Sequence, residues 1–256
     1  MPATYALHRF GADALRRLPG QMQQPILHFR RLYNVGLHGG DLFFYPTAST
    51  RTGDLYRLCG GMTGADFFAG AAAYLKQNPS EGGTACLYGL LGWYCLYSQL
   101  SSLINEATTQ GIATRTELEV ELDRYLLGLD GKTPPHTQDM SPHLKMTRGE
   151  CVTMASFFPA VTVRNFYSAY RSMVRWTRRM ARPRRGFATL LLKVTRSEFR
   201  QQMMPDHANH KCLHLDKPML ECYDRALEMF PDMARQLEVF CRNGTPLGEE
   251  FSRTIF

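Results

Sequence analysis

Residues 84–104 constrain the fold most, because they include no charged side chain over a length that could span a lipid bilayer. A transmembrane helix is therefore one interpretation. Against it, Gln99, several serines and two glycines interrupt the apolar residues, no basic residue directly flanks the stretch, and the chain has no second stretch of this kind. A helix that is apolar on all sides can also form the centre of a soluble bundle. We expect a buried central helix rather than a membrane span.

Apolar residues recur at helical spacing along most of the chain. The segments that we expect to be helical are 21–34, 67–77, 84–107, 116–128, 148–158, 160–182, 187–202 and 217–242. Thr63 and Asp66 have the spacing of a cap before the second of these segments. Alternation of apolar and polar residues hardly occurs, so the sequence predicts an all-α fold. We expect a single multi-helix bundle over residues 1–256, with a loop or sub-domain boundary near 129–147.

The composition is typical of a globular protein with one sizeable core, since the chain has 256 residues and 44% of them are hydrophobic. Its seven cysteines include no Cys-x-x-Cys pair, which argues against a disulfide framework and a zinc ribbon. Nucleophile-elbow and phosphate-loop motifs are also absent from the sequence. The first residues lack the pattern of a signal peptide, and we expect a cytoplasmic protein.

Residues 36–45 contain the first candidate for chemistry. His38 and Asp41 flank Gly39 and Gly40, which let the backbone turn sharply, and the apolar run 42–45 follows. A buried carboxylate beside an imidazole is typical of a metal site or a proton-transfer site.

This turn is one of a series of short segments. In order along the chain they are Pro2-Ala3-Thr4-Tyr5-Ala6 with Arg9-Phe10-Gly11, Gly36-Leu37-His38-Gly39-Gly40-Asp41, Ala65-Asp66-Phe67-Phe68, Leu87-Tyr88-Gly89 with Asn105-Glu106, and Asp123-Arg124-Tyr125-Leu126-Leu127. Together they resemble the bacterial zinc-dependent phospholipase C family over roughly the first half of the chain. The resemblance implies the helical fold of that family, a cluster of zinc ions and hydrolysis of phosphate esters.

The same resemblance implies where the zinc ligands would lie. The three ligands of the central helix fall on Trp93, Tyr97 and Ser101, none of which is a normal zinc ligand. The remaining family ligands fall on Leu7 (with His8 as its neighbour), Gly60, Arg115 and Glu119, and on Asp41 of the turn. Only Asp41 and Glu119 keep a metal-binding side chain, with His38 near them in the turn.

These replacements predict a site that has lost its metal, so we expect no cofactor. Trp93 and Tyr97 can fill the cavity and donate hydrogen bonds to a carboxylate. We expect Trp93, Tyr97 and Ser101 to share a buried face that points toward His38 and Asp41. Arg115 precedes Glu119 by one helical turn, and we expect it to form a salt bridge with Glu119 or Asp41, with Trp93 or Tyr97 as a further donor.

The functional prediction is a degenerate phospholipase C-like protein without catalytic activity, which has a binding or structural role toward an unknown small molecule or protein. The predicted ligand pocket comprises His38, Asp41, Trp93, Tyr97, Ser101, Arg115 and Glu119. One alternative is a metal-dependent phosphoric-ester hydrolase whose rebuilt zinc site uses His8, His38, Asp41 and Glu119.

A second alternative rests on a run of arginines. Its members are Arg171, Arg175, Arg178, Arg179, Arg182, Arg184 and Arg185, in a chain of formal net charge +7. Such a run can bind nucleic acid or an anionic membrane. A solvated helix face is the interpretation that we favour, because single basic runs are weak signals.

A last cluster lies near the C-terminal third of the chain. It comprises His207, His210, Cys212, His214 and Asp216, whose spacing is compatible with metal ligands. Pro205 and Pro218 flank the cluster, and we favour a polar loop with unrelated histidines.

Overall fold

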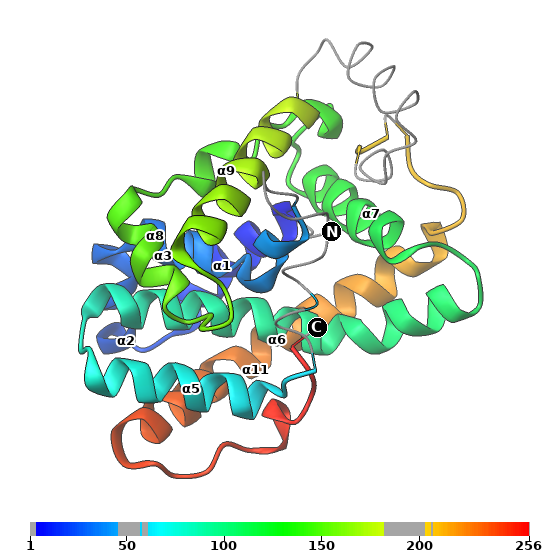
Figure 1. Cartoon of the computed structure of the whole chain (residues 1–256). Coiled ribbons are helices and arrows are strands. Elements are labelled where there is room, and N and C mark those ends of the chain that lie inside the picture. The colour runs from blue at the N-terminus through cyan, green and yellow to red at the C-terminus, as the bar shows by residue number, and fades with distance from the viewer. Residues whose placement is uncertain (1–3, 46–56, 58–60, 182–202, 206, 256) are drawn as a thin grey trace.

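The computed structural model describes residues 4–45, 57, 61–181, 203–205 and 207–255 (Figure 1). The α-helices in these ranges are α1 (Thr4–Arg17), α2 (Gly20–His28), α3 (Arg30–Gly36), α5 (Gly64–Gln77), α6 (Glu81–Thr109), α7 (Arg115–Leu129), α8 (Arg148–Ala155), α9 (Val163–Met180) and α11 (Asp216–Asn243). Short 3-10 helices are η1 (Gly39–Phe44), η2 (Pro135–Thr137), η3 (Ser141–Leu144), η5 (Leu213–Leu215) and η6 (Glu249–Phe251). Extended pairing within the described ranges is a single bridge between Thr63 and Thr254, so the all-α prediction is confirmed there.

Some predicted features lie outside the described residues. They are the helix expected at 187–202, the aligned ligand position Gly60, and Arg182, Arg184 and Arg185 of the basic run.

Helix α6 is the centre of the fold, as its uncharged sequence predicts. Every side chain from residue 85 to residue 98 is buried, and α1, α2, α3, α5, α7, α8 and α11 all pack against this helix (Figure 1). The surrounding helices explain how a helix without a polar face is accommodated. In the described ranges, no helix combines the length and the apolarity that crossing a bilayer requires.

Two glycines allow α3 to approach α6 closely. A Cβ atom added at Gly89 would lie 2.9 Å from the Cα atom of Gly36 and would also overlap the carbonyl oxygen of Tyr33. Any larger residue at position 89 would therefore push the two helices apart. This close crossing holds the chain segment that leads into η1 against the central helix.

The single helix expected at 21–34 is wrong, because the chain forms α2 and α3 with a break at Phe29. The φ and ψ angles of Phe29 are −115° and 45°, outside the helical range. Ile26 is buried on α2, whereas Leu27 is 52% exposed, since consecutive side chains on a helix point about 100° apart. Phe29 itself is 38% exposed.

Local signals place the starts of the next helices. Thr63 caps α5 by accepting a hydrogen bond from the backbone N–H of Asp66 at 3.1 Å, as predicted. Thr114 and Glu117 form a capping box at the start of α7. Between α7 and α8 the chain forms turns and the short 3-10 helices η2 and η3.

Candidate functional site

The turn η1 lies directly against α6. Gly39 has a φ of +41°, a conformation that L-residues with a side chain rarely adopt. A Cβ atom at this position would overlap the indole of Trp93. Gly39 therefore lets the indole pack on the backbone of the turn.

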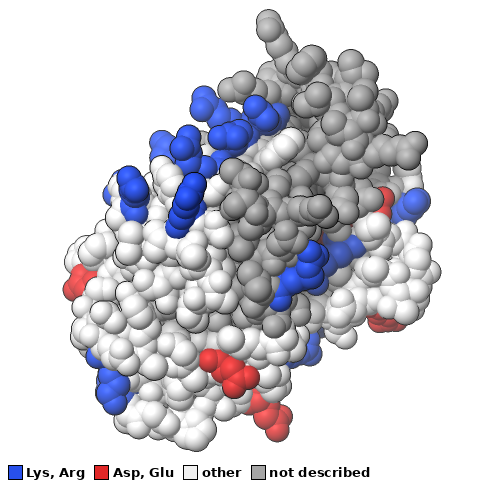
Figure 2. Space-filling view, in the orientation of Figure 1, with Lys and Arg blue, Asp and Glu red and all other residues white. Residues whose placement is uncertain are grey.

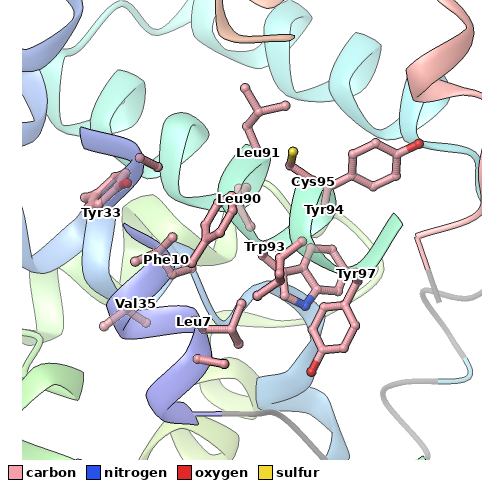
Figure 3. Close-up of a cluster of buried hydrophobic side chains, with 14 of the residues drawn as sticks. Leu7, Phe10, Tyr33, Val35, Leu90, Leu91, Trp93, Tyr94, Cys95 and Tyr97 are labelled. Atoms are coloured by element: carbon pink, nitrogen blue, oxygen red, sulfur yellow. The ribbon is translucent and has the colours of Figure 1, made fainter. Parts of the chain in front are cut away.

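Trp93 connects the central helix to Asp41, as the sequence predicts. Its Nε1–H donates a hydrogen bond to Oδ2 of Asp41 at 3.2 Å, and the side chain is only 2% exposed. Tyr97 is also buried, and its ring packs edge-on against the indole with 6.1 Å between ring centroids. Figure 3 shows both side chains projecting from α6 toward the same side, near Leu7.

Ser101 does not belong to this buried face, contrary to the prediction. It is partly exposed, and its hydroxyl accepts a hydrogen bond from Arg253 at 3.2 Å and donates one to the backbone oxygen of Ser98 at 3.3 Å. A spacing of eight residues rotates a helical side chain by about 80° relative to Trp93, because each residue adds about 100°. Residues four apart share a face more closely than residues eight apart.

The predicted ion pair is present on α7. Nε of Arg115 donates to Oε1 of Glu119 at 3.0 Å, and the Glu119 side chain is only 2% exposed. The Arg115 guanidinium also lies over the Tyr97 ring, 5.4 Å from its centroid. Asp41, Trp93, Tyr97, Arg115 and Glu119 form one group, which we call the buried polar cluster.

Burial and charge determine the protonation of this cluster. Burial, and then the nearby negative charge of Glu119, raise the pKa of Asp41 to about 8. Asp41 is therefore mostly an uncharged acid at neutral pH, while the positive charge of Arg115 stabilises the Glu119 carboxylate. The cluster can thus be buried without two adjacent negative charges.

Asp123 is a further buried carboxylate, which was part of the predicted series of segments but not one of the candidate site residues. It accepts hydrogen bonds from the backbone N–H groups of Tyr5 at 3.0 Å and Ala6 at 2.7 Å, and so caps α1. Burial raises the pKa of Asp123 to about 7. Its position four residues after Glu119, on the same face of α7, is the signal that could have identified it.

Three histidines, His8, His38 and His143, lie near one another. The rings of His8 and His143 stack with centroids 3.4 Å apart, and burial lowers the pKa of His8 to about 4. Burial, and then repulsion from His8 and His143, lower the pKa of His38 to about 3. These imidazoles are therefore neutral at physiological pH. The stacking of His143 on His8 was not predicted, because more than a hundred residues separate the two along the chain.

The side chains present do not fit zinc. Zinc needs three or four nitrogen, sulfur or oxygen ligands that converge on one point. Asp41 is engaged by an indole and Glu119 by a guanidinium. Ring nitrogens direct their lone pairs within the ring plane, so the stacked rings of His8 and His143 cannot both point at one ion between them. In the described part of the chain, no three His, Cys, Asp or Glu side chains are arranged to hold a metal.

Leu7, the position at which the resemblance implies an early zinc ligand, has apolar surroundings in the structure. Leu7 is fully buried beside α6, whereas His8 points to the side of His143. The rotation of about 100° between neighbouring residues on α1 explains why His8 does not substitute for the residue at position 7.

The histidine cluster near the C-terminal third does not converge either. His207, His210 and His214 are exposed, whereas Cys212 and Asp216 are buried. Asp216 lies 3.6 Å from Arg124 and starts α11, which accounts for its burial.

One small cavity reaches the edge of the site. It has a volume of about 80 Å³ and is lined by Tyr45, Asp123, Gln138 and Trp176, among others. This volume is far below the roughly 300–1,000 Å³ of typical small-molecule pockets. The described residues therefore leave little room for a ligand beside the buried polar cluster.

We expect Gly39→Ala to lower the free energy of unfolding by about 1–3 kcal/mol, because the methyl group would displace the Trp93 indole. Gly131→Ala is the matched control: Gly131 also has a positive φ, of 67°, but no atom would lie within 4 Å of the added Cβ. Urea denaturation of both variants measures the difference. Equal losses would contradict the packing role assigned to Gly39.

Comparison of the chain with protein-family models, with curated proteins and with solved structures finds no match in any of the three.

Proposed function

We propose that this chain is a divergent, metal-free relative of the zinc-dependent phospholipases C, with a binding or structural role in place of hydrolysis. One observation carries the proposal: Trp93 and Arg115, at positions aligned with zinc ligands, each engage one of the two remaining carboxylates. An indole and a guanidinium thus supply the hydrogen bonds and the positive charge that a metal would supply to Asp41 and Glu119.

The chemistry of the cluster supports a loss of catalysis. Phosphate-ester hydrolysis by a metal centre depends on a bound water whose pKa the metal lowers. The buried polar cluster contains no imidazole and is closed by Trp93 and Tyr97, which are 2% and 8% exposed. A substrate phosphate would have to displace these side chains to reach Asp41.

The rival function is a metal-dependent phosphoric-ester hydrolase with a rebuilt centre at His8, His38, Asp41 and Glu119. The observation in its favour is that the Nδ1 atoms of His8 and His38 are buried and have no hydrogen-bond partner among the described residues. Against it, no three His, Cys, Asp or Glu side chains of the described residues are arranged to hold a metal, and Asp41 is engaged by Trp93.

Zinc analysis of the purified full chain separates the two functions. We expect less than one tenth of an equivalent of zinc after dialysis, and no release of product from a chromogenic phosphodiester, with or without added zinc. Arg115→His should add one possible zinc ligand, an imidazole, without creating activity, since positions 93 and 97 remain Trp and Tyr. About one equivalent of zinc, with hydrolysis that a chelator abolishes, would show that the rival function is correct.

A further inference from the structure

A basic groove lies along α9, and its walls include no residue of the buried polar cluster. The groove has a volume of about 560 Å³, and its walls include Arg171, Arg175, Arg178, Arg179, Tyr167 and Tyr170. In the face drawn in Figure 2, blue side chains gather over α9, and no red side chain lies among them. Four arginines of the run identified in the sequence thus line this groove.

The arginines of the groove are not neutralised by the described part of the protein. None of the salt bridges between described residues includes Arg171, Arg175, Arg178 or Arg179. Glu150, an acidic residue near Tyr170, is bound by Arg31 at 3.0 Å and caps α8. Unpaired arginines in a hollow attract anionic ligands more strongly than the same charges on a convex face.

Stabilisation of helix α9 explains only some of these arginines. Arg178 and Arg179 lie in the last turn of α9, where positive charge stabilises the negative end of the helix dipole. Arg171 and Arg175 lie one to two turns earlier and gain little from the dipole. Their presence on the groove wall has no structural explanation in the described residues.

Aromatic rings alternate with the arginines. The Arg171 guanidinium lies over the Tyr167 ring, 5.8 Å from its centroid, and Tyr167 is partly exposed. The Tyr170 hydroxyl accepts a hydrogen bond from the backbone N–H of Met146 at 2.8 Å, which holds the floor of the groove in place. Basic residues that follow a backbone, with rings on which bases stack, are the combination used by proteins that bind single-stranded nucleic acid.

A membrane would be recognised differently. Peripheral helices insert an apolar face into the bilayer. The apolar face of α9 is already used in the protein core, because Phe166, Ala169 and Met173 are fully buried. Among the large apolar side chains exposed in the described residues, only Val163 belongs to α9, at the opposite end from Arg178. The charge complementarity therefore favours a phosphate backbone over a lipid surface.

We propose that the α9 groove binds single-stranded nucleic acid, with Arg171 and Arg175 contacting phosphates and Tyr167 stacking on a base. This inference is independent of the proposed function, since it uses no residue of the buried polar cluster.

Fluorescence anisotropy of the full chain with labelled twenty-nucleotide oligo-U and oligo-dT tests the proposal. The logarithm of the association constant should fall linearly with the logarithm of salt concentration. Arg171→Gln/Arg175→Gln should make the slope shallower by about 1.4, since each phosphate contact to a single strand contributes about 0.7. Tyr167→Ala should weaken binding about fivefold or more at a constant salt slope.

The matched control is Arg235→Gln/Arg242→Gln, which changes net charge equally at two exposed arginines of α11. It should leave the slope nearly unchanged, and circular dichroism should show that all variants are folded. The proposal is overturned if the control lowers the slope as much as the groove variant does. Absence of oligonucleotide binding at 50 mM salt would also overturn it, as would phosphatidylserine vesicles that bind tightly and displace the oligonucleotide.

Discussion

Trp93→Ala should lower the free energy of unfolding by about 3–5 kcal/mol, the range observed for large aromatic side chains removed from a well-packed core. The indole is 2% exposed, lies against Gly39 and donates to Asp41, so its loss creates a cavity and removes the donor of a buried acid. Urea denaturation with a constant m-value is the appropriate measurement.

Trp93→Phe provides the control for this experiment. It keeps most of the volume and removes only the N–H, so it should cost about 1–3 kcal/mol, as expected for an unsatisfied buried polar group. A loss near zero for Trp93→Ala would mean that the site is an open pocket, and the proposal of a packed, metal-free cluster would then be wrong.

Arg115→Ala should lower the free energy of unfolding by about 3 kcal/mol, because it removes the guanidinium that pairs with the buried Glu119 carboxylate. The value is placed at the low end of the range for broken buried pairs, since the Arg115 side chain is 39% exposed. Arg242→Ala is the matched control: Arg242 pairs with Glu238 at the same spacing of four residues, but both side chains are exposed. That change should cost about 1 kcal/mol or less.

A double-mutant cycle distinguishes charge from packing at Arg115. In a Glu119→Gln background, Arg115→Ala should cost much less than in the natural chain, because no buried charge remains to be compensated. Equal costs in both backgrounds would show that the aliphatic part of Arg115 stabilises the protein mainly by packing on Tyr97.

These two experiments address one physical requirement. A carboxylate buried next to another carboxylate must be protonated, paired or bound to a metal. In this chain Asp41, whose pKa is raised to about 8, is mostly protonated at neutral pH and accepts a hydrogen bond from Trp93, while Glu119 is paired with Arg115. Removal of Trp93 or Arg115 should therefore destabilise the fold.

Several features follow from local sequence alone. The uncharged run of α6 predicted a buried central helix, the Thr63 and Asp66 spacing predicted the cap of α5, and the four-residue spacing of Arg115 and Glu119 predicted their ion pair. Each depends on residues within one or two helical turns, whose relative positions the α-helix itself determines.

Other features depend on contacts between distant segments. Asp123 caps the start of α1 from a helix more than a hundred residues later, and His143 stacks on His8 across a similar separation. The gathering of arginines around one groove likewise depends on how α9 packs against the loop that contains Met146. Helical periodicity determines which side chains share a face, but only the packing of helices decides which faces meet. The sequence therefore predicted two contacts of the buried polar cluster, Trp93 with Asp41 and Arg115 with Glu119, whereas the tertiary structure decided that Ser101 lies outside it and that Asp123 is buried at the start of α1.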